Sequence, residues 1–163
     1  MKSIREAIST IVNDCISEIK RNSTNAGQVA TGRTLKSLQG EVFSYGDAYT
    51  AQIIGAAYLG VLETGRGRAK NEGTPYQQKE FLRNLVEWCR IRQIPREAIS
   101  EEQYEQFAKY LKWRINRYGT QLYQRGGRKD IITPPIEKMI KRIEDEILLL
   151  IDGEIKSTTS RFF

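Results

Sequence analysis

The residues best suited to chemistry lie in one short basic loop, Gly65-Arg-Gly-Arg-Ala-Lys70. Three cations so close together suit a phosphate group or an acidic protein surface. The loop does not match a nucleotide phosphate loop, because the chain contains no Gly-Lys pair, and it lacks the third glycine of a dinucleotide-binding loop. We therefore interpret the segment as a docking loop and not as part of a catalytic site.

The remaining reactive residue types argue against an enzyme. The chain has no histidine, which excludes Ser-His-Asp and Cys-His nucleophile systems and histidine-ligated zinc. Cys15 and Cys89 fall on apolar helix stripes, so we expect both to pack in a core. The adjacent carboxylates at 101–102 and 144–146 point in different directions on a helix and do not form an acid–base pair. We expect no catalytic residue, metal or cofactor.

Charge and aromatic content leave two kinds of partner open. The 26 Lys and Arg residues outnumber the 20 Asp and Glu residues, giving a formal charge of +6. Trp113 and Tyr123 lie near Arg114, Arg117 and Arg125, a mixture found on surfaces that stack single-stranded nucleic acid. The same residue types dominate protein–protein hot spots. We favour the protein interface and keep a small basic nucleic-acid-binding protein as the alternative.

Apolar periodicity and start signals predict four long helices and one hairpin. Apolar residues recur at helical spacing in each predicted helix, and Ser3 and Thr74 begin capping boxes. Ser100, followed by Glu101, Glu102 and Gln103, starts a further helix. Strand formers flank the turn Gly46-Asp47. The expected segments are a helix at 3–21, a mobile loop at 22–33, a hairpin at 41–55, a basic loop at 64–73, and helices at 75–93, 101–118 and 134–152.

Two shorter segments are less regular. Residues 57–63 are apolar and are compatible with either a short strand or a helical turn. A second small hairpin is expected between residues 121 and 133, with Leu122-Tyr123 opposite Ile131-Ile132 around two glycines.

Together these segments predict a single α+β domain, 1–163, with long amphipathic helices packed on a small antiparallel sheet. The longest apolar run, 147–151, is far shorter than the roughly 20 residues that cross a bilayer, so we expect no membrane association. The charged first residues do not resemble a secretion signal. Two cysteines in this length favour a reducing compartment.

Five motifs in order resemble one protein family. They are Thr31-Gly-Arg-Thr-Leu-Lys-Ser37, the 42–54 hairpin, Tyr58-Leu-Gly-Val-Leu-Glu-Thr-Gly-Arg-Gly67, Glu87-Trp-Cys-Arg-Ile-Arg-Gln-Ile94 and Ile115-Asn-Arg-Tyr-Gly-Thr120. This series, over residues 30–132, resembles the head–tail joining, tail-completion or neck proteins of tailed bacteriophages. Gln93 departs from the pattern, because those proteins usually have glycine there.

The resemblance implies a virion structural protein, assembled in the host cytoplasm, that forms a ring of the head–tail connector. The implied partners are further copies of the chain, the portal and adjacent connector or tail proteins, while DNA passes through the ring without sequence-specific binding. In this interpretation the docking loops contain Arg33, Glu63, Arg66, Arg68 and Lys70.

Overall fold

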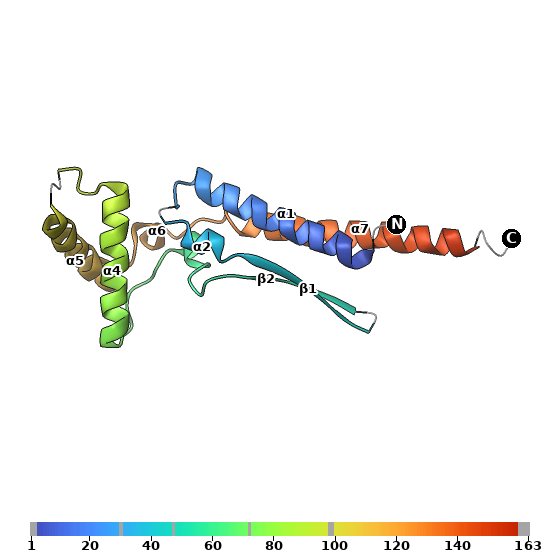
Figure 1. The fold of residues 1–163 in the computed structure, drawn as a ribbon, viewed down its shortest axis with the longest axis horizontal. Helices are drawn as coiled ribbons and strands as arrows, with labels where there is room; N and C mark the ends of the chain where they lie inside the picture. Colours follow the sequence, from blue (N-terminus) through green and yellow to red (C-terminus); the bar gives the residue numbers. More distant parts are fainter. Residues whose placement is uncertain (1–2, 30, 47, 72, 98–99, 160–163) are drawn as a thin grey trace. The chain divides into compact units, whose positions relative to one another are not determined.

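The computed structural model describes residues 3–29, 31–46, 48–71, 73–97 and 100–159 and confirms the α+β class (Figure 1). Its elements in chain order are α1 (Ile4–Asn25), α2 (Arg33–Lys36), β1 (Gln39–Tyr45), β2 (Ala48–Ile54), α3 (Val61–Thr64), α4 (Pro75–Arg92), α5 (Glu101–Tyr118), α6 (Gln121–Gln124) and α7 (Thr133–Thr159).

Contacts within the chain form two compact units. Unit 1 comprises Met1–Gly27, Thr34–Ala57 and Lys129–Phe163, and unit 2 comprises Gln28–Arg33 and Tyr58–Arg128. The single-domain organisation stays a prediction, and each unit is described by itself.

Helix α1 supplies most of the core of unit 1. The Ser3 hydroxyl accepts from the Glu6 amide at 3.3 Å and the Glu6 carboxylate accepts from the Ser3 amide at 2.9 Å, which confirms the capping box. The predicted apolar stripe is buried, with Ile8, Ile11 and Ile19 no more than 2% exposed. This stripe has an apolar neighbour on two sides, because α1 packs against both the hairpin and α7.

The end of α1 corrects the predicted loop at 22–33. The helix continues through Asn25, because polar residues here bond within the helix: the Thr24 hydroxyl donates to the Lys20 carbonyl at 2.9 Å. The helix ends at Asn25, and Gly27, two residues later, has a φ of +66°, which suits a residue without a side chain. The expected mobility of the loop stays a prediction for the residues beyond this glycine.

The predicted hairpin is confirmed with small shifts in its bounds. Strands β1 and β2 pair antiparallel, with Val42 opposite Ala51 and Phe43 opposite Thr50. Gly40 lies directly against Val12 and Ile16 of α1, where a Cβ atom would collide with the Val12 side chain and crowd that of Ile16. Val42 shares that face and is buried, whereas the alternate face is open. Gly46 of the predicted turn has a φ of +58°, and Asp47 lies outside the described residues.

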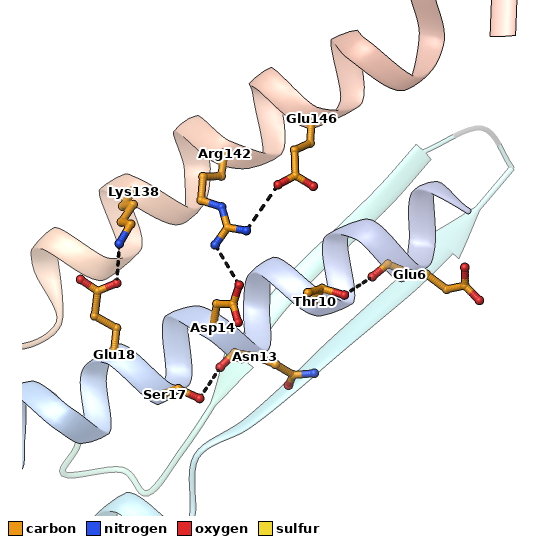
Figure 2. Close-up of polar contacts among 9 residues, drawn as sticks. All are labelled: Glu6, Thr10, Asn13, Asp14, Ser17, Glu18, Lys138, Arg142 and Glu146. Atoms are coloured by element: carbon orange, nitrogen blue, oxygen red, sulfur yellow. Dashed lines mark hydrogen bonds and ion pairs between the residues drawn. The ribbon is translucent and has the colours of Figure 1, made fainter. Parts of the chain in front are cut away.

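Helix α7 runs antiparallel to α1, and ion pairs flank their apolar contact (Figure 2). Lys138 donates to Glu18 at 2.9 Å and Arg142 to Asp14 at 2.9 Å. Arg142 also reaches Glu146, one turn along α7, at 3.3 Å. Ile11 and Cys15 of α1 border this contact. The helix includes the predicted 134–152 range and continues to Thr159.

Unit 2 is built on the helix pair α4 and α5, which begin after Thr74 and Ser100 as predicted. The capping box at Thr74 is confirmed, and Ser100 forms one as well. Helix α4 ends at Gln93, which takes the left-handed conformation with a φ of +52°. Of the apolar side chains on the two helices, only Cys89 and Ala108 are fully buried. Most of the other apolar side chains on the two helices, such as Leu85 and Leu111, are half-buried, so the pair has a small fully buried core.

The prediction of a second small hairpin between residues 121 and 133 is wrong. Leu122 and Tyr123 belong to the short helix α6, because the Thr120 hydroxyl accepts from the Tyr123 amide at 3.4 Å and starts a helical turn. Ile131 and Ile132 form no strand and directly precede α7. The ambiguous segment at 57–63 is a turn leading into helix α3. Within the described residues, no helix combines the length and apolar character needed to span a bilayer.

The two cysteines give a test of the core packing. Cys15 is 4% exposed and Cys89 is fully buried. Burial, with a smaller contribution from Glu18, raises the pKa of the Cys15 thiol to about 11, and burial raises the pKa of Cys89. We expect both thiols to react with a maleimide far more slowly in the folded protein than in denaturant. Equal rates would contradict the structural assignment.

The same pKa shift predicts a loss of stability at high pH. A neutral thiol is favoured by the fold, so the stabilisation is complete below the unfolded pKa of about 9 and is lost as the pH rises through about 11. The free energy of unfolding, measured in urea between pH 8 and 11, should fall. The fall should be smaller in Cys15→Ala, which lacks the titrating group; identical pH slopes in the two proteins would count against this origin.

Candidate functional site

The five predicted docking residues all lie in unit 2, but the structure gives them different environments. Arg33 is held by neighbours within the unit: its guanidinium pairs with the Glu87 carboxylate at 2.6 Å and donates to the Asn84 side chain at 3.3 Å. The Glu63 carbonyl accepts from the Arg128 amide at 2.8 Å. Both residues therefore have structural partners in the chain, and their part in docking stays a prediction.

The first half of the basic loop is bonded to the junction between α5 and α6. The Arg66 amide donates to the Thr120 hydroxyl at 3.0 Å, and the Arg66 carbonyl accepts from the Thr120 amide at 2.8 Å. The Ala69 amide donates to the Asn116 carbonyl at 2.9 Å. At Gly119, where φ is +80°, a Cβ atom would lie 2.6 Å from the Tyr123 ring. The close approach of the loop thus requires glycine at this junction.

Arg66 and the two other cations of the loop differ in exposure. The Arg66 guanidinium stacks on the Phe81 ring, 3.6 Å from its centroid, and burial lowers its pKa. Arg68 and Lys70 are exposed, and no described residue pairs with either side chain. The docking-loop interpretation therefore applies directly to Arg68 and Lys70, whereas Arg66 belongs to a groove.

This groove, which we call the basic groove, lies in unit 2 and has a volume of about 610 Å³. Its apolar wall comes from α4, α5 and α6, and its charged groups are Arg66 and Arg114; no carboxylate lines it. The apolar lining residues are Phe81, Leu85, Trp88, Ile94, Leu111, Ile115 and Leu122. A concave apolar surface with a few polar groups is the usual form of a binding pocket.

A second groove in unit 2, of about 720 Å³, is lined by both signs of charge. Glu80 pairs with Arg83 at 3.5 Å, and Glu101 pairs with Arg90. Its charges are largely compensated within the unit. The two grooves therefore differ mainly in electrostatics, since only the basic groove presents cations without carboxylates.

The outer surface of α5 carries a row of aromatic rings. Successive ring centroids from Phe107 through Tyr110 and Trp113 to Tyr118 are 6.1, 6.2 and 6.1 Å apart. Arg117 lies 5.7 Å from the Trp113 ring, which is half-exposed. The sequence groups Trp113 with Tyr123 near arginines, whereas the rings that lie beside Trp113 are those of Tyr110 and Tyr118. The three-residue spacing of Tyr110 and Trp113 on a predicted helix is the signal that could have identified that pair.

Unit 1 exposes two further apolar surfaces. On the open face of the hairpin, Phe43 and Ile54 are about half-exposed and Tyr45 is 92% exposed. On α7, Leu148 is 67% and Leu149 is 71% exposed. The sequence pattern marks these leucines only as part of a short apolar run, because periodicity alone does not show which positions of a helix remain uncovered.

No group of three or more metal-ligating side chains occurs within the described residues. A scan against protein-family models finds no match, and searches of curated proteins and of solved structures find none either. The resemblance to phage connector proteins therefore depends on the ordered motifs alone.

The bonding of the basic loop predicts uneven hydrogen exchange. In the free protein, the amides of Arg66, Ala69 and Thr120 should exchange more slowly than those of Arg68 and Lys70, for which no acceptor is described. Residue-resolved exchange measured by NMR tests this difference, with the urea-unfolded chain as the control for intrinsic rates. Uniformly fast exchange across the loop would show that the junction does not hold it.

Proposed function

We propose that this chain is a structural subunit that assembles into a ring of the head–tail connector or neck of a tailed bacteriophage, and that it acts in the virion without catalysis. The observation that carries the proposal is the hairpin. Its sheet has two strands in the described part of the chain, and α1 covers only one face. The outer edges of both strands and the open face with Phe43 and Tyr45 remain available.

Such a hairpin is suited to assembly. A strand edge presents amide and carbonyl groups that pair readily with another chain, and a two-stranded sheet gains stability from added strands or packed surfaces. In a ring the same contact repeats around one axis, so modest single contacts combine into a stable particle. The motif series supplies the identity of the particle, as a phage connector.

The charge of the chain favours acidic neighbours. A ring of six to twelve copies at +6 each carries +36 to +72, which is costly unless carboxylates or ions offset it. Arg68 and Lys70 are the exposed cations of the docking loop. They would meet carboxylates on the portal or on an adjacent connector or tail protein, while DNA passes through the ring without sequence-specific contacts.

The second candidate function is nucleic-acid binding, which the aromatic row on α5 favours. Exposed rings with Arg114 and Arg117 beside them resemble a stacking platform for single strands. This function would show an affinity that falls steeply with salt concentration. The open hairpin is not explained by it, so we place it second.

Native mass spectrometry of the purified protein, alone and with the portal protein of the same phage, tests the proposal. We expect closed oligomers or a defined complex with the portal ring. The variant Arg68→Glu/Lys70→Glu should stay folded by circular dichroism but join the portal complex at least about tenfold less well, because two contacts repeat around the ring.

The control variant Arg5→Glu/Lys141→Glu makes the same change in net charge at exposed positions of unit 1. This control should join the portal complex nearly as well as the wild type does, and better than Arg68→Glu/Lys70→Glu. A protein that stays monomeric under all these conditions, or that binds single-stranded DNA strongly at physiological salt, would overturn the connector assignment. Equal losses in both double variants would show that net charge, not the docking loop, is responsible.

A further inference from the structure

The outward surface of α7 carries a small amphipathic patch in the described part of the chain. Leu148 and Leu149 are 67% and 71% exposed, although leucine side chains gain most from burial. Glu144 and Asp145 precede them by one helical turn, so each carboxylate lies beside one leucine on the same face. Both carboxylates are exposed, and no described residue pairs with either. We call these four residues the α7 leucine face.

The basic groove of unit 2 has the complementary character. Its wall is apolar, and Arg66 and Arg114 line it without any carboxylate. The described contacts of their guanidinium groups are with aromatic side chains, Phe81 for Arg66 and Tyr110 for Arg114. An arginine placed beside an apolar surface pairs well with a carboxylate, since partial desolvation strengthens the charge-assisted hydrogen bond.

We propose that the α7 leucine face of one copy of this chain docks into the basic groove of a neighbouring copy, with Leu148 and Leu149 against the apolar wall and Glu144 and Asp145 paired with Arg66 and Arg114. This is a helix-in-groove contact, in which an amphipathic helix places its apolar residues in an apolar cleft. The inference rests on the proposed function, because it specifies the contact by which the ring subunits join.

Electrostatics selects this groove over the other groove of unit 2. The second groove contains Glu80, Glu87, Glu101 and Glu105, which would repel Glu144 and Asp145. Two of its three cations, Arg83 and Arg90, are also already paired. The basic groove offers cations without carboxylates, so the acidic leucine face matches it in sign as well as in apolarity.

The two halves of the contact lie on different surfaces of the chain, one in unit 1 and one in unit 2. A contact between two different surfaces is heterologous, and repeating it generates a ring when the rotation between copies closes. The contact therefore has the symmetry that a ring subunit needs.

Two variants test the contact at its two ends. Leu148→Ser/Leu149→Ser removes the apolar part of the leucine face, and Arg114→Glu reverses a charge in the groove. Each should raise the concentration needed for assembly by about a hundredfold or more, because repeated burial of two leucines, or a repeated ion pair, is lost. Ile140→Ser on α7 and Lys112→Glu on α5 are the matched controls, since neither residue belongs to the proposed contact, and both should assemble like the wild type.

Mixing the two variants gives a sharper result. The groove variant keeps an intact leucine face and the leucine-face variant keeps an intact groove. An equimolar mixture should therefore form 1:1 heterodimers that grow no further, measured by native mass spectrometry. A mixture that remains monomeric at concentrations where the wild type assembles would overturn the heterologous contact.

A disulfide trap gives a readout that does not depend on the stability of these variants. Leu149→Cys and Gln121→Cys, combined in one chain, place a thiol at each side of the contact, since Gln121 lines the groove. The native Cys15 and Cys89 are buried and should not compete. Mild oxidation should give a ladder of covalently linked copies, whereas each single variant should give dimers at most.

The outcomes separate this inference from the proposed function. If the wild type forms rings but the variants assemble equally well, the contact is wrong and the ring function stands. If the disulfide forms within one chain, the groove is filled by its own α7 and the contact between copies is wrong. If the wild type is monomeric alone and with the portal, both proposals fail.

Discussion

The apolar stripe of α1 is the constraint on which unit 1 depends. Val12 and Ile16 on one side of the helix receive the backbone of the hairpin at Gly40, while Ile11 and Cys15 border α7. A two-stranded hairpin is marginal in water by itself, so its position follows from this contact. Surface ion pairs such as Lys138–Glu18 help to align α1 with α7 but add little free energy, because the Lys138 side chain remains exposed to solvent.

A helix that covers one face of each neighbour leaves the other faces open. The outer face of the hairpin and the leucines of α7 are exposed for this reason, and the α4–α5 pair has a small core around Cys89 and Ala108. Scattered apolar residues on a surface are ordinary, but these occur in groups on regular elements, which is typical of surfaces that bind other proteins. A subunit whose core is completed by neighbouring chains would have this distribution.

The sequence predicts the elements well where their signals are local. Capping boxes at Ser3, Thr74 and Ser100 fix three helix starts, and strand formers around one turn fix the hairpin. The end of α1 and the identity of α6 are missed, because single hydroxyl-to-backbone bonds decide them. The sequence predicts less of the candidate site than of the helices and the hairpin. Arg66 stacks on Phe81 and is hydrogen-bonded to Thr120, and only tertiary packing brings these residues together, because they are far apart in the sequence.

The distribution of charge connects the fold to assembly more directly than the net charge does. A net charge of +6 indicates only that an acidic partner would be attracted to the chain. Within the described residues, however, the unpaired arginines Arg66 and Arg114 lie in an apolar groove of unit 2, and the unpaired carboxylates Glu144 and Asp145 lie beside exposed leucines of unit 1. The groove has cations without carboxylates, and the α7 leucine face has carboxylates without cations. Because both surfaces belong to the same chain, the proposed contact would let a second copy supply the acidic partner. The net charge of +6 per chain would be unaltered by that contact, and Arg68 and Lys70 would remain free to meet a different protein. Self-assembly and docking would then use separate cations of one unit.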